Sequence, residues 1–396
     1  MNKKHIGIFL GVTVVVLVAA VVAVNKEQSA VVNKQAGAYL FPGLEGKIND
    51  VAKIEVVKGS DHVTIQHGDN DWQIVEKDNY PADLSKIKEV VMKIAAFTTV
   101  EPKTKKPDNY GKLNVEDPTG ENAKSVQVTL KDKAGKDMAS VIVGRMESGG
   151  FTSVGQDKTY VRKAKDDQVW LVNGGLVVNE TPSNWVTEEI LNIDSSRVKK
   201  VAITHKGDKT ATKVVTIEKD KPGNGDFVLA DLPKGKEPKS QAELAQVARS
   251  MERLRMLDVQ KADGFDFPDD KTIITELQTF DGLVITASTL KQAGNYQTKF
   301  TARFDPALRP AEPAPTPAAA TDANKKDEAK NATDKKDAAA QTDPHTPKPP
   351  ALKEAALVKQ EADQLNQQLS PWVFTLNKSK AKNLVEDLDD LLKDKT

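Results

Sequence analysis

Hydrophobic and polar residues alternate in short stretches along much of the chain, and one such stretch occurs twice. Residues 48–56 read Ile-Asn-Asp-Val-Ala-Lys-Ile-Glu-Val, and a looser copy occupies residues 193–203. In each copy an acidic residue precedes a short β-branched run interleaved with lysines. This alternation predicts a strand with one buried face and one solvated face. Ile54 in the first copy and Val201 in the second are 147 residues apart.

The turn glycines repeat this offset. Gly135 and Gly282 are also 147 residues apart, and each lies between two alternating stretches that predict a β-hairpin. Two landmarks with one offset indicate a doubled module. We therefore predict an α+β fold with an N-terminal transmembrane helix followed by two related β-rich modules, each an antiparallel sheet with a packed helix. The expected strands are residues 54–57, 63–66, 72–75, 126–130, 139–143, 159–162 and 169–172, then 200–204, 214–218, 227–230, 273–279, 283–288 and 296–304.

Each module should carry one amphipathic helix after its first strands. In the first module Asp83 is the expected N-cap. In the second module residues 240–243 have the Ser-x-x-Glu form of a capping box. Apolar residues then follow at helical spacing and predict packing on a sheet. The two stripes are Leu84, Ile87, Val90, Val91, Ile94 and Ala95, and Leu244, Val247, Ala248, Met251 and Leu254.

The end of the chain interrupts and then resumes the pattern. Residues 306–350 contain almost no large apolar side chain, so we expect a disordered insertion that cannot offset the entropy of ordering. Residues 372–376 resemble residues 169–172, which predicts that they form the closing strand of the second module. We also expect a helix over residues 352–369. A last amphipathic helix should begin at Ala381 and bury the stripe Leu384, Val385, Leu388, Leu391 and Leu392.

The N-terminus carries an apolar run over residues 6–24 that follows Lys3 and Lys4. As a helix these 19 residues would span about 28 Å, enough to cross a bilayer core. The lysines predict that residues 1–5 stay in the cytoplasm and that the C-terminal region is exported. The alternative is a cleaved signal peptide, for which Val21-Val22-Ala23 is a passable cleavage site.

These patterns divide the chain into seven parts. The parts are a cytoplasmic N-terminus (1–5), a transmembrane anchor (6–24), a spacer (25–43), a first α+β module (44–189), a second α+β module (190–305), a disordered insertion (306–350), and C-terminal helices with the closing strand (351–396). The end of the spacer, residues 39–44, contains apolar residues that could dock on the first module.

Composition narrows the function classes. Lysine plus arginine and aspartate plus glutamate both number 57, so no net charge attracts the chain to nucleic acid. The chain contains no cysteine, which excludes disulfides, thiolate nucleophiles and cysteine metal ligands. Apolar residues make up 38% of the chain, which is enough to build a core.

No motif predicts a catalytic, cofactor-binding or metal-binding residue. His62 and His67 are five positions apart on one expected strand, so their side chains should point to opposite faces. The acidic turn at residues 220–226 lacks the glycine and the final glutamate of a calcium loop. The basic run 103–106 is expected to be solvated loop, or else a contact for lipid headgroups or an acidic partner. The four tryptophans, Trp72, Trp170, Trp185 and Trp372, are expected to pack in the core, with carbohydrate stacking as the alternative.

Several short motifs, in this order, resemble the bacterial family known as domain of unknown function 4340. They are Leu44–Val51 with its Glu-Gly-Lys, Trp72-Gln73-Ile74-Val75, Tyr80-Pro81-Ala82-Asp83, Leu113-Asn114-Val115-Glu116-Asp117-Pro118, Tyr160-Val161-Arg162, Val169-Trp170-Leu171-Val172 and Trp372-Val373-Phe374. The insertion at residues 306–350 departs from the family pattern. The resemblance implies a membrane-anchored extracytoplasmic protein related to auxiliary components of ABC-type transport and gliding-motility systems, and it carries over no catalytic residue.

These observations favour a non-catalytic accessory or scaffold protein of the bacterial inner membrane, with its C-terminal region in the periplasm. Its expected partners are the membrane, through the N-terminal helix, and other membrane proteins, including ABC-type transporter subunits. Nucleic acid and cofactors are not expected. The alternative function is a binding module for an envelope polysaccharide or lipid. An enzyme would require clustered carboxylates in a cleft.

Overall fold

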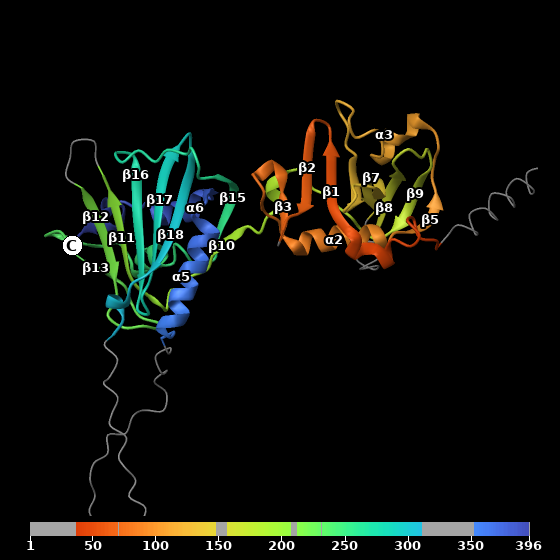
Figure 1. Ribbon diagram of the computed structural model, residues 1–396. Helices are drawn as coiled ribbons and strands as arrows, with labels where there is room; N and C mark the ends of the chain where they lie inside the picture. The colour runs from red at the N-terminus through yellow and green to blue at the C-terminus, as the bar shows by residue number, and fades with distance from the viewer. Residues whose placement is uncertain are drawn as a thin grey trace, which may run out of the picture. The chain divides into compact units, whose positions relative to one another are not determined.

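The chain divides between Thr187 and Glu188 into two units, unit 1 and unit 2. The structure is a computed structural model that describes residues 37–69, 71–147, 157–206, 212–230, 232–310 and 352–395 (Figure 1). The predicted anchor, residues 6–24, and nearly all of the predicted insertion, residues 306–350, lie outside these ranges. Among the described residues, no helix is long and apolar enough to cross a membrane.

Unit 1 is built on a nine-stranded antiparallel sheet with the strand order β4-β3-β2-β1-β6-β7-β8-β9-β5. Its elements are η1 (Glu45–Asp50), β1 (Val51–Lys58), β2 (Asp61–His67), β3 (Trp72–Ile74), η2 (Val75–Lys77), β4 (Tyr80–Pro81), α2 (Leu84–Ala95), β5 (Thr98–Pro102), η3 (Pro107–Asn109), α3 (Tyr110–Leu113), β6 (Val126–Asp132), β7 (Asp137–Glu147), β8 (Lys158–Lys163), β9 (Val169–Asn173) and η4 (Pro182–Trp185).

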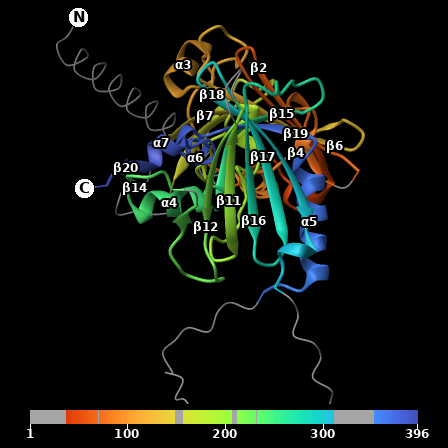
Figure 2. The same ribbon diagram turned by 90° about the vertical axis from the view of Figure 1, so that its left-hand side faces the viewer.

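Unit 2 contains a second nine-stranded antiparallel sheet, with the order β10-β15-β19-β18-β17-β16-β11-β12-β13. Its elements are β10 (Glu189–Leu191), β11 (Val198–His205), β12 (Lys213–Glu218), β13 (Val228–Leu229), β14 (Lys236–Pro238), α4 (Gln241–Ala248), β15 (Leu254–Lys261), β16 (Thr272–Thr279), β17 (Leu283–Gln292), β18 (Asn295–Phe304), η5 (Pro306–Leu308), α5 (Ala355–Leu369), β19 (Trp372–Leu376), α6 (Lys378–Leu384), α7 (Leu388–Leu391) and β20 (Leu392–Asp394). Figure 2 shows β12, β11, β16 and β17 side by side. The two large antiparallel sheets and the few helices confirm the predicted α+β class.

The two sheets share one strand pairing at a constant offset. In unit 1, Ile54 on β1 pairs with Leu130 on β6. In unit 2, Val201 on β11 pairs with Leu277 on β16. Both partners are therefore shifted by the same 147 residues that separate the sequence landmarks. The register of each strand pair also shifts at equivalent positions, between Val51 and Lys53 on β1 and between Val198 and Lys200 on β11.

The predicted helices form where their caps were expected. The Asp83 carboxylate accepts the Ser85 backbone N–H at 2.9 Å and begins α2. The Ser240 hydroxyl accepts the Glu243 backbone N–H at 3.3 Å and begins α4.

Most of the apolar stripe of α2 is buried, but Leu84 at its start is 46% exposed. The stripe prediction is therefore wrong at that residue, which borders solvent at the first turn. It is also wrong at the end of the second stripe, because α4 ends at Ala248 and Leu254 begins strand β15.

The closing strand prediction is confirmed. Strand β19 lies between β15 and β18 and pairs with both. Phe374 and Leu376 are buried, as expected for the core face, and the Phe374 ring lies 6.1 Å from the ring of Phe300. Val373 is buried as well, and Trp372 is only half-buried. Both faces of this central strand are therefore covered at its middle.

The prediction of one last helix is wrong. Helix α6 ends at Leu384, and the chain continues as the single turn α7 and then as β20, which pairs with β14. The Thr275 hydroxyl donates to the carbonyl of Leu384, the last residue of α6. This hydrogen bond satisfies one of the carbonyls that a helix leaves without a partner at its C-terminus. Glu386, which follows α6, is buried, and burial raises the pKa of its carboxyl. Strand pairing and burial thus override the helical spacing of the leucines.

An ion-pair cluster fastens α5 to the sheet of unit 2. The Arg197 guanidinium donates to the Asp281 carboxylate at 2.9 Å and to the Glu361 carboxylate of α5 at 2.9 Å. Asp281 is 1% exposed, so loss of Arg197 would leave a buried carboxylate without its ion-pair partner. Lys353 donates to Glu361 at 2.9 Å. Burial alone would raise the pKa of Glu361, but the hydrogen bonds from Arg197 and Lys353 outweigh it and lower the pKa.

We predict that Phe374→Ala lowers the free energy of unfolding by about 3–5 kcal/mol, the usual range for a buried aromatic side chain. Phe374 is fully buried on a strand with partners on both edges, so truncation leaves a cavity. Urea unfolding of the full-length protein measures the loss. Thr301→Ala, at an exposed position of β18, is the matched control. An effect of Phe374→Ala no larger than that of the control would contradict the placement of this strand in the core.

We predict that Glu361→Gln lowers the free energy of unfolding at pH 7 and has a much smaller effect at about pH 2–3. The folded pKa of Glu361 is lowered, so its ionised form stabilises the fold above the unfolded pKa of about 4.3. This contribution is lost as the pH falls through the folded pKa. Urea unfolding at both pH values tests the difference, with the exposed Asp363→Asn on the same helix as control. A deficit of equal size at both pH values would refute the ionic role of Glu361.

Candidate binding clefts of unit 1

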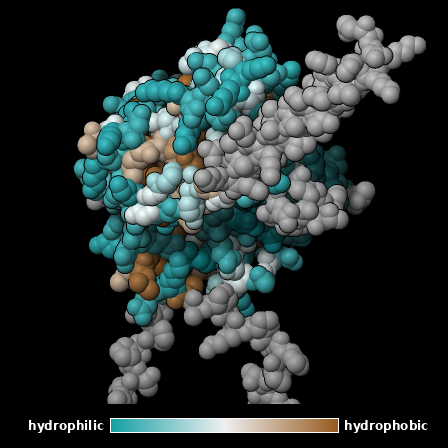
Figure 3. Space-filling view, turned by 90° about the vertical axis from the view of Figure 1, so that its right-hand side faces the viewer, coloured by the Kyte–Doolittle hydropathy of each residue, from teal (hydrophilic) through white to brown (hydrophobic). Residues whose placement is uncertain are grey.

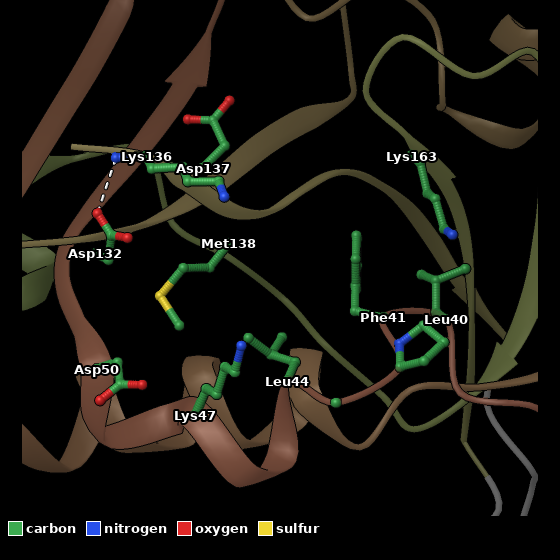
Figure 4. Close-up of a pocket in the computed structure, with 12 residues that line it drawn as sticks. Leu40, Phe41, Leu44, Lys47, Asp50, Asp132, Lys136, Asp137, Met138 and Lys163 are labelled. Carbon is green, nitrogen blue, oxygen red and sulfur yellow. Dashed lines mark hydrogen bonds between the residues drawn. The ribbon is translucent and has the colours of Figure 1, made fainter. Parts of the chain in front are cut away.

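A cleft of about 440 Å³ opens in unit 1 between the N-terminal segment and the β6–β7 hairpin (Figure 4). We call it the inner cleft. It is lined by Leu40, Phe41, Pro42, Gly43, Leu44, Lys47, Asp50, Asp132, Lys136, Asp137, Met138 and Lys163. Figure 4 shows Met138 and Phe41 on opposite sides of the open space, with Leu44 below and Lys163 above.

The N-terminal wall is held in place by backbone hydrogen bonds to β5 and to the residue before it. Gly37 N–H donates to the Thr99 carbonyl at 2.7 Å, and Leu40 N–H donates to the Phe97 carbonyl at 2.8 Å. Leu40 and Leu44 are buried, which confirms that the end of the predicted spacer docks on the first module. The sequence therefore fixes Phe41 between two buried leucines, at the mouth of the cleft.

The opposite wall is the hairpin turn between β6 and β7. The Asp132 carboxylate accepts the backbone N–H groups of Ala134 and Lys136, each at 2.9 Å. Gly135 has φ 79°, a value that L side chains rarely adopt. One oxygen of the Asp132 carboxylate therefore accepts both hydrogen bonds and stabilises the turn, as in an Asx-turn.

The charges of the inner cleft balance. Three cations and three anions line it: Lys47, Lys136 and Lys163, and Asp50, Asp132 and Asp137. The Lys163 Nζ lies 5.5 Å from the centroid of the Phe41 ring, a cation–π distance. Apolar side chains and charges of both signs therefore line the inner cleft, and this mixture suits an occupant with both apolar and polar groups.

A second cleft of about 430 Å³, the outer cleft, lies over the polar face of the same sheet. It shares Phe41, Asp137, Met138 and Lys163 with the inner cleft, and it is further lined by Glu55, Gln127, Thr129, Lys131, Ala139, Ser140, Ala164 and Lys165. Lys53 and Lys131 lie 2.9 Å and 3.1 Å from the Glu55 carboxylate. Burial alone would raise the pKa of Glu55, but these two lysines lower it. The negative charge of Glu55 is therefore balanced by Lys53 and Lys131, whereas Lys163 and Lys165 add positive charge to the outer cleft.

An apolar groove of about 330 Å³ lies along α2. Its exposed apolar side chains are Leu84 and Met92, the latter 57% exposed. Trp72 also lines it, with its ring 5.6 Å from that of His67. Figure 3 shows one face of the molecule as mostly hydrophilic, with hydrophobic residues gathered in small patches. Small exposed apolar patches are normal on a folded protein, so exposed apolar residues alone do not indicate a binding site. The groove along α2 is a candidate because it is concave.

The histidines and the acidic turn do not converge on a reactive centre. The His62 ring bonds with the Thr64 hydroxyl at 2.9 Å, whereas the His67 ring packs edge-on against Trp72. The turn at residues 220–226 is fastened by Lys219, which donates to the Gly223 carbonyl at 2.7 Å. Desolvation lowers the pKa of this buried lysine. Within the described ranges, no three His, Asp or Glu side chains are placed to hold a metal ion.

The tryptophans differ in burial. Trp185 is buried and donates its indole N–H to the Asn179 carbonyl at 2.9 Å, as a core tryptophan should. Trp72, Trp170 and Trp372 are half-buried. The prediction of core packing therefore holds fully for one of the four.

Comparison with known families defines the class of protein. The fold is a pair of antiparallel sheets of like topology, and a family model described as Domain of unknown function (DUF4340) matches residues 72–272, just over half of the chain. The chain belongs to this family. No curated protein and no solved structure matches it.

The matched region runs from β3 in unit 1 to the start of β16 in unit 2, so the family pattern includes parts of both units. The motifs at residues 80–83, 113–118 and 160–162 lie inside it. The motifs at residues 44–51 and 372–374 lie outside it. The inner cleft is therefore built partly from residues beyond the matched region, in the N-terminal wall.

Proposed function

We propose that this protein is a non-catalytic accessory or scaffold subunit of a membrane assembly, with an ABC-type transport system as the leading candidate. In this proposal residues 6–24 anchor it in the bacterial inner membrane, and the C-terminal region lies in the periplasm. The lysines before the apolar run support this orientation. The inner cleft supports a binding role near the membrane, because its N-terminal wall begins at Gly37 and only 12 residues separate Gly37 from the proposed anchor.

The composition of the inner cleft is the observation that carries the proposal. Two buried leucines and Phe41 supply apolar surface, and three lysines and three aspartates supply charges of both signs. A protein segment presents the same mixture of apolar side chains, charges and backbone groups. Asp50, Asp132 and Asp137 line the cleft, but Asp132 is bound to the turn, and the three are not among any described group placed to hold a metal ion. The lining residues include no imidazole or thiol. We therefore favour a protein partner over a reaction at this cleft.

We also infer that the two units arose from one duplicated module. The shared strand order and the 147-residue offset of paired residues support this inference. Duplication would leave each unit with the same framework and free the connections to diverge.

The alternative function, a binding module for an envelope polysaccharide or lipid, draws support from the groove along α2. Its half-exposed Trp72 and its exposed Leu84 and Met92 would suit an acyl chain or a sugar face. This groove and the inner cleft have no lining residue in common. Substitutions in one groove can therefore be tested without altering the other.

We predict that a photoreactive residue in the inner cleft crosslinks to an integral membrane protein in cells. p-Benzoylphenylalanine would replace Lys136 or Met138, one exposed and one half-buried at the cleft. The same residue in place of the exposed Lys112 on α3 is the control. After irradiation and carbonate washing of the membranes, both cleft positions should give one common adduct that the control lacks. No adduct from either cleft position, or the same adduct from Lys112, would count against the proposed function.

A further inference from the structure

Each unit has a central meander of three consecutive strands, β6, β7 and β8 in unit 1 and β16, β17 and β18 in unit 2. The two units differ in how far the third strand extends along the second. In unit 2, β18 pairs with β17 as far as Leu283, whose partner is Phe304. In unit 1, β8 ends at Lys163, whose partner on β7 is Val141. Residues 137–140 of β7 therefore have a partner strand on the β6 side only, within the part of the chain that the structure describes.

The pairing registers show that these positions are equivalent. Val141 pairs with Val128 on β6, and Ala287 pairs with Thr275 on β16. Val128 and Thr275 are 147 residues apart, so Val141 and Ala287 occupy the same place in the two sheets. Unit 2 continues β18 beyond this place for four more residues, Thr301 to Phe304. Unit 1 instead turns towards β9.

The backbone of β7 at this place faces the clefts. The Ser140 carbonyl accepts the Ala164 N–H at 3.0 Å, which shows that the backbone groups of Ser140 point towards β8. The pairing of Lys131 with Asp137 makes Met138 the extra residue of a β-bulge, so the next backbone groups on the same edge are those of Asp137, which lines both clefts. Met138 lines both the inner and the outer cleft. The edge of β7 therefore runs between the two clefts.

We propose that this edge of β7 is a docking site for an extended segment of a protein partner, which adds to the sheet of unit 1 as an antiparallel strand. The proposal rests on the proposed function and specifies how the partner binds. Unit 2 provides the internal precedent, because residues 301–304 of its own chain fill the equivalent position. Strand addition supplies main-chain hydrogen bonds, and alternate side chains supply specificity.

The two clefts set the chemistry of the partner segment. Successive side chains of an added strand point to opposite faces, so they would enter the inner and the outer cleft in turn. The inner cleft offers apolar contacts from Leu44 and Phe41. The outer cleft offers the cations Lys163 and Lys165, since the carboxylates of Glu55 and Asp137 already face Lys131. The segment should therefore alternate apolar and acidic residues.

Unit 2 differs in charge at the equivalent place. Arg303 of its own added stretch lies 3.6 Å from the Glu276 carboxylate on the polar face. The residue of unit 1 that corresponds to Glu276 is Thr129, and the carboxylate of its cross-strand partner Glu55 is held by Lys53 and Lys131. This difference favours a distinct acidic partner over a copy of residues 301–304, whose Arg303 would find no such carboxylate.

The test uses a fluorescein-labelled nine-residue peptide of alternating valine and glutamate and the full-length protein in detergent. The dissociation constant is measured by fluorescence anisotropy at low salt. Three further peptides separate the contributions. One has the same residues in two blocks, one replaces glutamate with lysine, and one carries N-methyl groups on alternate amides along one edge. Each should bind at least about tenfold more weakly, because each loses the side-chain alternation, the charge match or the main-chain hydrogen bonds.

Protein variants provide the matching arm. Ser140→Pro removes an N–H at the edge and should weaken binding of the alternating peptide by about tenfold relative to Ser140→Ala, which removes only the side-chain hydroxyl. Lys163→Glu with Lys165→Glu should reverse the preference between the glutamate and lysine peptides. If Ser140→Pro fails to fold, the N-methylated peptide still tests the same hydrogen bonds.

Absence of binding, equal binding of the block and alternating peptides, or unchanged binding after N-methylation would each overturn strand addition. The outcome is separable from that of the proposed function. Crosslinks in cells without binding of the alternating peptide would keep the partner role and reject this mode. Peptide binding without crosslinks would keep the strand-accepting edge and reject the partner role.

Discussion

A strand edge is a row of N–H and C=O groups that need hydrogen-bond partners, and this requirement separates the two units. Unit 2 meets it within its own chain, because β18 runs the full length of β17 and α5 packs alongside β18 (Figure 1). Unit 1 meets it only in part, because β8 stops at Lys163. The difference of a few residues converts a closed edge into one that borders two clefts.

Other parts of unit 1 form the walls beside that edge. Hydrogen bonds to Phe97 and to Thr99 of β5 hold the N-terminal segment, so that Phe41 stands across the inner cleft from Met138. Asp132 shapes the hairpin turn through two backbone N–H groups. In unit 2 the Arg197 cluster instead fastens α5 and reaches Asp281 in the equivalent turn. One framework thus supports a closed unit and an open unit.

Much of this fold could be predicted from the sequence. A period of two in hydrophobicity placed most strands, and the apolar residues 372–376 revealed a closing strand far along the chain. The last helix could not be predicted, because leucines at helical spacing are also consistent with a short helix followed by a paired strand at β20. The clefts could not be predicted either. Their walls come from residues 40–50, 132–138 and 163–165, and only the folded sheet brings these together. The one available signal was the short connection between residues 163 and 169, where the second module has the long insertion.

Hydrogen–deuterium exchange of the full-length protein, in detergent and in membranes of cells that express it, tests the open edge of β7 most directly. In detergent, the amides of Asp137 and Ser140 should exchange faster than their unit 2 counterparts, Val284 and Thr286, which β18 covers. In the membranes, where the proposed partner would be present, the amides of Asp137 and Ser140 should become protected while those of Val284 and Thr286 stay unchanged. Equal and slow exchange of the two pairs in detergent, or no added protection of Asp137 and Ser140 in membranes, would contradict the account.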